Sequence, residues 1–177
     1  MNDIITTKRL NLIPCDHQMV GRILLDFENL PSLLNLRIPE NWPIFPEAFQ
    51  YVYDLLKTNP EESVWWTYIF VNREEKVIVG SGGYKGPPKN ESVEIGYEIA
   101  PEFRNQGYAT EAARGFITHA FKHPSIKVVK ASTLPMVNAS NRVLEKCGMG
   151  FIETSLDEEV GEVWFYEVFK EKFLNKE

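Results

Sequence analysis

Cysteine and histidine are scarce in this sequence. Two cysteines, Cys15 and Cys147, and three histidines occur among 177 residues. The cysteines lie too far apart for a CxxC pair or a disulfide framework, and the histidine spacing suggests no metal site. These scarcities favour a reducing intracellular compartment and argue against a metal cofactor.

Long apolar runs and an excess of positive charge are also missing. No apolar stretch is long enough to span a bilayer, and the first residues lack the charged head and apolar segment of a secretion signal. The net charge is −6 at pH 7, which argues against binding along a phosphate backbone. We therefore expect a cytoplasmic protein that binds neither membranes nor nucleic acid.

The residues that are present suit a single α/β domain spanning residues 1–177. Hydrophobic residues make up 44% of the chain and charged residues 25%, enough for a core and a polar surface. Periodicity and turn signals predict strands at 10–13, 64–71, 77–83, 93–99, 126–133, 151–154 and 163–169. They predict a helix that Asp16 caps and that runs to about Phe27, a helix at 47–57, and a helix from 109 to a stop at Pro124. They also predict a helix at 139–147 closed by Gly148 as a left-handed cap, and a loop-rich connection at 31–46.

The most informative transition runs from the strand at 93–99 to the helix that begins at Ala109. The strand alternates strictly, with Glu94, Gly96 and Glu98 on one face. The helix repeats apolar residues every three or four positions, as on a helix packed against a sheet. Between them lies the sequence Arg104-Asn105-Gln106-Gly107-Tyr108-Ala109.

This turn has the chemistry of an anion site. The first N–H groups of a helix lack partners and lie at the positive end of its macrodipole. Gly107 removes a side chain where the backbone approaches an anion, Ala109 lets the helix sit close, and Arg104 adds a mobile cation. Gly-x-Ala alone is a weak signal, because many strand-to-helix turns use small residues without binding a ligand. Glycines at 80, 82 and 83 hint at a dinucleotide fingerprint, but Gly86-Pro87-Pro88 follows where a helix should begin.

Three motifs together resemble the GNAT superfamily of N-acetyltransferases. Arg104-x-x-Gly107-x-Ala109 after the strand at 93–99 is similar to its acyl-CoA-binding motif. Thr7–Leu12 and Ser140–Met149 are similar to motifs of its ribosomal-protein N-terminal acetyltransferase (RimJ/RimL-like) branch, and the order of elements fits over nearly the whole chain. The resemblance implies a GNAT-like fold, a mixed and mostly antiparallel twisted sheet flanked by helices.

The resemblance also implies acetyl-CoA as co-substrate, no metal, and direct attack of a primary amine on the thioester in a ternary complex. The acceptor would be a small-molecule amine or a protein N-terminus. Where the strand at 93–99 diverges from its neighbour, a backbone N–H close to Ile99 or Ala100 would stabilise the oxyanion. Pantetheine would pair with the same strand edge as an added strand. A homodimer is expected from the family alone. The residues implied in CoA binding are Ile99, Ala100, Arg104, Asn105, Gln106, Gly107, Tyr108, Ala109, Thr110 and Asn138.

One position departs from the branch. Its last motif usually begins with an asparagine three residues before the serine, where this chain has Val137, and Asn138 is displaced by one. Asn138 either supplies the family hydrogen bond near the pantetheine or caps the helix that begins at Ala139.

Glu94 and Ser140 are the predicted catalytic residues. An alkyl amine with a pKa near ~10.4 is almost entirely protonated at pH 7 and needs a proton acceptor. Glu94 resembles the family's general base in position, although a cross-strand ion pair or a solvated site explains it equally, and Glu98 on the same face is the second candidate. Ser140 matches the serine proposed to reach the CoA sulfur, or is a plain helix cap. Tyr97 and Tyr108 are further candidate donors.

These observations leave three functions to compare. The first is an acetyl-CoA-dependent N-acetyltransferase. The second is a catalytically inactive module that senses acyl-CoA, and the third is a nucleotide-dependent regulator that uses the same turn for phosphates. Trp42 and Phe45 lie in the segment that forms part of the acceptor wall in this superfamily, and core packing is their alternative explanation.

Overall fold

A computed structural model describes residues 4–157 and 161–175 of the chain. Its centre is an eight-stranded sheet in the order β1-β2-β3-β4-β5-β6-β8-β7. Only β5 and β6 pair in parallel, and the other neighbours are antiparallel. The strands are β1 Ile5–Thr6, β2 Leu10–Pro14, β3 Thr67–Asn72, β4 Val77–Tyr84, β5 Ser92–Ile99, β6 Val128–Thr133, β7 Gly150–Asp157 and β8 Gly161–Phe169.

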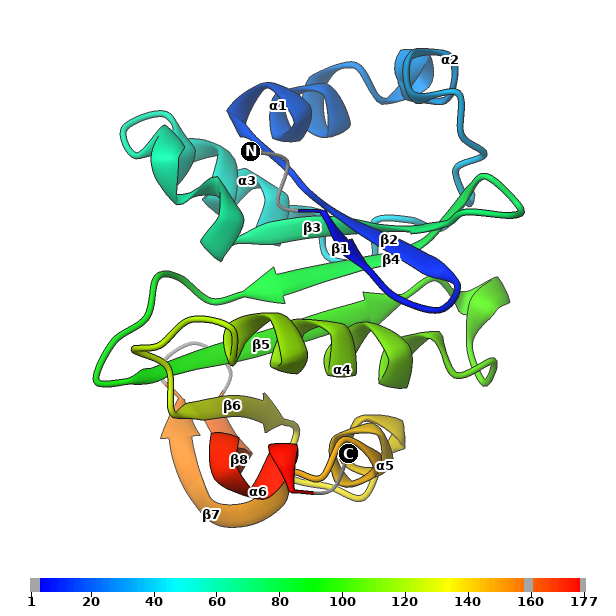
Figure 1. Cartoon of the computed structure of the whole chain (residues 1–177). Coiled ribbons are helices and arrows are strands. Elements are labelled where there is room, and N and C mark those ends of the chain that lie inside the picture. The colour runs from blue at the N-terminus through cyan, green and yellow to red at the C-terminus, as the bar shows by residue number, and fades with distance from the viewer. Residues whose placement is uncertain (1–3, 158–160, 176–177) are drawn as a thin grey trace.

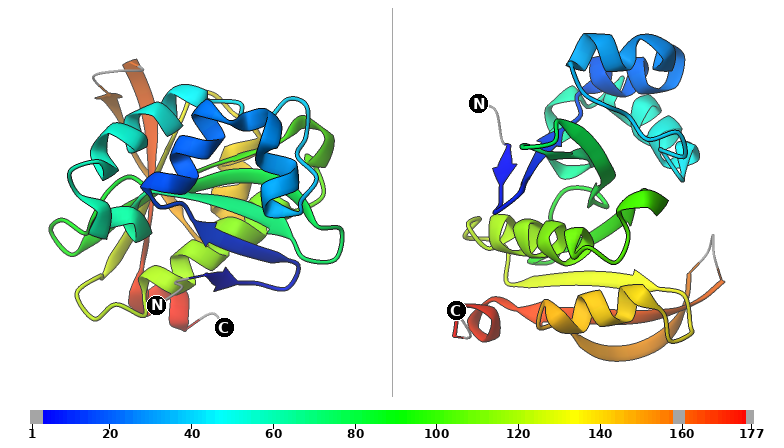
Figure 2. Two further views of the ribbon diagram at one scale, coloured as in Figure 1. Left: turned by 90° about the horizontal axis from the view of Figure 1, so that it is seen from above. Right: turned by 90° about the vertical axis from the view of Figure 1, so that its right-hand side faces the viewer.

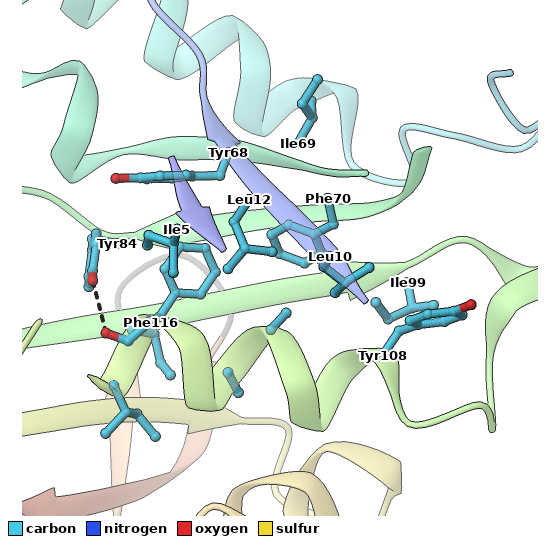
Figure 3. Packing of buried hydrophobic residues seen from close by; sticks show 14 of the residues in the cluster. Ile5, Leu10, Leu12, Tyr68, Ile69, Phe70, Tyr84, Ile99, Tyr108 and Phe116 are labelled. Carbon is cyan, nitrogen blue, oxygen red and sulfur yellow. Dashed lines mark hydrogen bonds between the residues drawn. The ribbon is translucent and has the colours of Figure 1, made fainter. Parts of the chain in front are cut away.

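Helices cover both faces of this sheet (Figures 1 and 2). In β2 and β3, the large side chains of Leu12 and Phe70 point towards α4, whereas Ile69 points to the opposite face, over which α1 and α3 lie (Figure 3). The α-helices are α1 His17–Leu25, α2 Leu30–Leu34, α3 Pro46–Leu56, α4 Tyr108–Ala120, α5 Ala139–Lys146 and α6 Lys170–Leu174, and short 3-10 segments are η1 Phe27–Asn29, η2 Pro60–Trp65 and η3 Pro101–Phe103.

The layer between the sheet and α4 holds the densest part of the core. Phe116 of α4 is fully buried, and its ring meets those of Tyr68, Phe70 and Tyr84 at centroid distances of 5.1–5.8 Å. The Tyr84 hydroxyl donates to the Phe116 carbonyl oxygen at 2.9 Å, which satisfies a buried polar group beside the rings (Figure 3). This packing fixes the position of α4, whose first two residues, Tyr108 and Ala109, are the end of the anion-site sequence.

The fold class and the main elements are as predicted from the sequence. Each predicted strand and each predicted helix has a counterpart that begins or ends within a few residues of its expected bounds. Asp16 caps α1 through the Met19 amide, and Gly148 takes the left-handed conformation (φ 82°) after α5. The expected strand at 64–71 begins only at Thr67, because Pro60 starts a 3-10 turn that runs to Trp65. The 31–46 connection overlaps the short helix α2, and β1 and α6 were not predicted.

The glycines at 80, 82 and 83 serve packing in the middle of β4. A Cβ on Gly83 would lie 1.7 Å from the Trp66 carbonyl oxygen, and one on Gly82 would lie 2.3 Å from the Gly96 carbonyl oxygen. Their absent side chains therefore allow close approach of the neighbouring backbone. The sequence-based rejection of a dinucleotide fingerprint agrees with this placement inside a continuous strand.

We expect Gly83→Ala to lower the free energy of unfolding by about 2–4 kcal/mol, because backbone must move to admit the new Cβ. Gly150→Ala is the matched control, since a Cβ there meets nothing within 4 Å. It should change stability by less than about 1 kcal/mol. Chemical denaturation of both variants measures the difference, and equal losses would contradict the packing argument.

Candidate active site

The anion-site sequence forms an exposed turn between η3 and the start of α4. Asn105 (φ 60°) and Gly107 (φ 82°) both adopt the left-handed conformation, which asparagine tolerates and glycine adopts freely. Arg104, Asn105, Gln106 and Gly107 are all exposed. The turn thus presents backbone, with little side-chain bulk at Gly107, to the solvent.

Most backbone N–H groups of this turn lack a protein acceptor in the part of the chain that the structure describes, and the exception is the Arg104 amide, which donates to the Pro101 carbonyl oxygen at 3.3 Å. Within residues 4–157 and 161–175, none of the amides from Asn105 to Thr110 donates to a backbone or side-chain oxygen. No side chain caps α4, whose N-cap residue is Gly107. Unpaired donors at the positive end of a helix of 13 residues have the geometry and charge that favour an anion.

The side chains of the turn are partly engaged. Arg104 donates its Nε to the Ile99 carbonyl oxygen at 3.2 Å, so its guanidinium lies beside the end of β5. Tyr108 is buried and its hydroxyl contacts Asn72 Nδ2 at 3.0 Å, so this residue offers only its amide to a ligand. Ala109 packs against the core, and Thr110 lies in the same helical turn.

Beside the turn, β5 loses one of its neighbours. Its parallel pairing with β6 runs from Ser92↔Val128 to Ile95↔Ala131 and stops there, while its pairing with β4 continues to Ile99. The Ala100 amide donates to the Val79 oxygen on the β4 side at 2.9 Å, so by alternation the amides of Tyr97 and Ile99 point to the β6 side. The sequence placed the oxyanion donor close to Ile99 or Ala100, and the Ala100 amide is already used by β4.

Glu94 lies on β5 just before this divergence and is held by two polar groups. Lys85 Nζ donates to Glu94 Oε1 at 2.5 Å, and Ser132 Oγ donates to the same oxygen at 2.8 Å. The side chain is about a quarter exposed. Glu94 therefore makes the cross-strand ion pair that the sequence left as its alternative role. Oε2 accepts no hydrogen bond in the described part of the chain.

Glu98, two residues further on, holds the segment that precedes α3. Its carboxylate accepts from Ser81 Oγ at 2.6 Å and from the amides of Ile44 and Phe45 at 3.2–3.3 Å. Burial raises the pKa of Glu98, although these hydrogen bonds oppose the increase. Trp42 is buried, and its indole donates to the same Ser81 hydroxyl at 3.0 Å.

Gly96 leaves space between the two carboxylates. A Cβ at this position would meet only Lys85 Cε, at 3.8 Å. Phe45 is 54% exposed on the segment that Glu98 holds, so an apolar ring borders the same region. Of the two aromatic residues considered for the acceptor wall, Trp42 belongs to the core and Phe45 remains accessible.

The start of α5 lies on the other side of β5. Asn138 is its N-cap, because its Oδ1 accepts from the amides of Ser140 at 2.8 Å and Asn141 at 3.2 Å. Ser140 is partly exposed, and its Oγ makes no hydrogen bond within the described residues. The Tyr97 hydroxyl lies 3.5 Å from the Ser140 carbonyl oxygen. Tyr97, a further candidate donor predicted from the sequence, thus lies adjacent to Ser140.

The structure adds residues that the sequence did not single out. Glu94 is contacted by Lys85, which directly follows β4, and by Ser132 of β6, and Glu98 is contacted by Ser81 of β4. Only strand register brings them together, and register was not read from the sequence. No group of three or more His, Cys, Asp or Glu side chains that could hold a metal ion occurs among residues 4–157 and 161–175. Over the same residues, no helix is long and apolar enough to cross a membrane.

Comparison with known families decides the assignment. Residues 9–150 match the model of the acetyltransferase (GNAT) domain. The chain belongs to the GNAT acetyltransferase family. As a GNAT protein it is an N-acetyltransferase, an enzyme of the acyltransferase class, as the three sequence motifs predicted.

Curated relatives and solved structures agree with this membership. The chain is 27% identical to the uncharacterized N-acetyltransferase YjdG of Bacillus subtilis over 148 residues. This match covers 82% of the chain and 88% of YjdG. It is 31% identical over 94 residues to an FsC-acetyl coenzyme A-N(2)-transacetylase of Aspergillus fumigatus, and this match covers 49% of the chain and 40% of that protein.

Two solved structures share the fold along nearly the whole chain. A RimL ribosomal L7/L12 alpha-N-protein acetyltransferase in complex with coenzyme A superposes with a TM-score of 0.68 at 18% identity, over 94% of this chain and 98% of that one. The spermidine/spermine N-acetyltransferase SpeG of Vibrio cholerae does so with a TM-score of 0.68 at 17% identity, over 95% and 98%.

We expect Gly107→Ala to weaken CoA binding about fivefold, because a left-handed alanine costs about 1 kcal/mol and binding must restore that conformation. Gly161→Ala is the matched control, since Gly161 has the same φ of 82° and a Cβ there meets nothing within 4 Å. Both variants should lose similar stability. Calorimetric titration with CoA should separate them, and equal affinities would argue against a role for the turn.

Proposed function

We propose that this enzyme transfers the acetyl group of acetyl-CoA to a primary amine by direct attack within a ternary complex. The observation that carries the proposal is the run of unpaired amides at the start of α4, next to the unpaired edge of β5. The acceptor is a small-molecule amine or a protein N-terminus. Acetylation of both kinds of amine is named among structures that share the fold.

The thioester binds along β5 beyond Ile95, where that strand has no partner on the β6 side among the residues that the structure describes. The amide of Tyr97 or Ile99 stabilises the oxyanion that forms when the amine attacks the carbonyl carbon. The amides from Asn105 to Ala109 hold the diphosphate, and Arg104 adds positive charge beside it. Asn138 orients the start of α5 by capping it, and its Nδ2 remains available to the pantetheine.

The acceptor amine approaches over Gly96, between Glu94 and Glu98. Glu94 accepts the proton from the attacking nitrogen, directly or through a water, with Oε2 as the available atom. Glu98 fixes the wall formed by Ile44 and Phe45 and adds negative charge that favours a cationic amine. Ser140 Oγ, at the start of α5, donates a hydrogen bond to the departing sulfur, and the Tyr97 hydroxyl lies 3.5 Å from the carbonyl oxygen of the same residue.

The function itself is tested by measuring CoA release from acetyl-CoA with a panel of amines. We expect turnover with at least one small amine or one peptide bearing a free N-terminus. Tight CoA binding without turnover on any amine would instead favour the inactive sensor. Tighter binding of ATP or NAD than of CoA would favour the nucleotide-dependent regulator.

We expect Glu94→Gln to lower kcat/KM about 10²- to 10³-fold and to remove the acidic limb of its pH profile, because the proton acceptor is lost. Lys85→Met is the comparison variant, because it removes the same ion pair and keeps the carboxylate. It should retain activity within about threefold, as expected for a partly exposed ion pair. Similar losses in both variants would reduce Glu94 to an ion-pairing role.

The variant Glu98→Gln tests which of the two carboxylates, Glu94 or Glu98, acts as the base. If Glu98 positions the acceptor wall, the KM for the amine should rise while the acidic limb of the pH profile remains. If this variant alone lost that limb, Glu98 would be the base and the assignment of Glu94 would fail.

A further inference from the structure

The amino-terminal motif contacts the first turn of α4 through one carboxylate. Glu111 Oε1 accepts from Thr7 Oγ1 at 2.6 Å and from the Arg9 amide at 2.6 Å, and its Oε2 accepts from Arg9 Nε at 2.7 Å. Glu111 is largely buried, with 14% of its side chain exposed. The sequence singled out Thr7–Leu12 as a motif, and the proposed chemistry gives it no role.

The Arg9 side chain continues from Glu111 to the anion turn. Its Nη1 donates to the Gln106 carbonyl oxygen at 3.0 Å, and its guanidinium carbon lies 4.2 Å from the centre of the Tyr108 ring. Its Nη2 lies 3.5 Å from the place of a Cβ on Gly107. One guanidinium therefore contacts Gln106 and Tyr108 and lies beside Gly107. Its planar fork allows this geometry, which an ammonium group does not.

The bond to Gln106 fixes the direction of a donor. The peptide that joins Gln106 to Gly107 is planar and trans, so its carbonyl oxygen and the Gly107 N–H point to opposite sides. When Arg9 holds this oxygen, the Gly107 N–H is turned away from Arg9 and kept there. Gly107 alone has no side chain to restrain this peptide, and its left-handed conformation is only one of several open to glycine.

The pairing also removes an unfavourable charge. Glu111 lies in the first turn of α4, close to where an anion would bind. Although burial raises its pKa, the hydrogen bonds from Thr7 and Arg9 bring the pKa of Glu111 below its ordinary value, so it is a carboxylate at neutral pH. Arg9 balances this charge at 2.7 Å. The cluster is thus neutral as a whole and repels no phosphate.

We propose that the Thr7–Arg9–Glu111 cluster is a positioning device that aims the amides of the turn at the diphosphate of CoA. The proposal rests on the proposed function, since it assumes that CoA binds at this turn. Arg9 and Glu111 act through Gln106, Gly107 and Tyr108 and are positioning residues. The acetyl group reacts elsewhere, so the device affects cofactor affinity and leaves the chemical step unchanged.

Arg9→Lys keeps the charge and removes the fork. We expect CoA affinity, measured by calorimetry, to fall about tenfold, as for the loss of hydrogen bonds to charged groups. The KM for acetyl-CoA should rise by a similar factor with kcat within twofold. Arg22→Lys, on α1, is the matched control and should bind CoA like the wild type.

Acetyl-pantetheine distinguishes a role in diphosphate binding from a general loss of structure, because it carries the thioester and lacks the diphosphate. A general loss of structure would lower activity with this substrate as well. Its kcat/KM should be the same in Arg9→Lys and in the wild type. Equal losses with acetyl-CoA and acetyl-pantetheine would show that Arg9 only supports the fold, and the proposal would then be wrong.

The variant Glu111→Gln distinguishes positioning of the turn by the cluster from an effect of net charge on CoA binding. If the cluster positions the turn, this variant should weaken CoA binding, because Arg9 loses the carboxylate that holds it. If net charge alone matters, removing a negative charge should tighten binding, and the proposal would fail. Glu91→Gln is its control, since Glu91 makes an exposed ion pair with Lys127 at the opposite end of β5.

The wild type distinguishes this inference from the function on which it rests. If the wild-type protein bound no CoA, both would fall. If it bound CoA and Arg9→Lys and Glu111→Gln bound it equally well, only the role of the cluster would be refuted.

Discussion

The site depends on the early end of the parallel pairing between β5 and β6. After Ile95↔Ala131, β5 stays with β4 as far as Ile99, whereas β6 stays with β8 as far as Thr133. Beyond this point each strand is still paired on one side, β5 with β4 and β6 with β8. The facing edge of β5 therefore presents backbone N–H groups that β6 does not use. Unpaired backbone groups inside a protein are costly, and a ligand with amide groups of its own can satisfy them.

The candidate residues of β5 lie on both faces of the strand. Residues with odd numbers, such as Tyr97 and Ile99, face the side of α4 and α5, where the turn and Ser140 lie. Residues with even numbers, Glu94 and Glu98, lie on the opposite face, where Glu98 accepts hydrogen bonds from the segment before α3. Because side chains along an extended strand alternate with a period of two, β5 presents different groups to the two sides of the sheet. Gly96 keeps the acceptor side open between the carboxylates.

Much of the fold could be predicted because strong local patterns encode it. The apolar stripe of α4, the alternation of β5 and the Asp16 cap each depend on neighbouring residues alone. The position of the anion turn followed from the same patterns. Short elements such as β1 and α6 have too few residues to show a period, and α2 starts at Leu30, next to a proline that reads as a break.

The environment of the candidate residues could not be predicted in the same way. Lys85 meets Glu94 because β4 and β5 pair in one register, and Ser81 meets Glu98 for the same reason. A shift of one residue would turn each side chain to the other face. The Asn138 cap was foreseen as an alternative, because its position before α5 is a local feature.

The distance along the chain between Arg9 and Glu111 has a consequence for synthesis. The partners are 102 residues apart, so the amino-terminal segment leaves the ribosome long before α4 exists. Until then Arg9 has no carboxylate to meet, and the sheet between them must assemble first. Contacts of such long range form slowly because a large loop must close. The contacts that hold this turn therefore form only after α4 has been made.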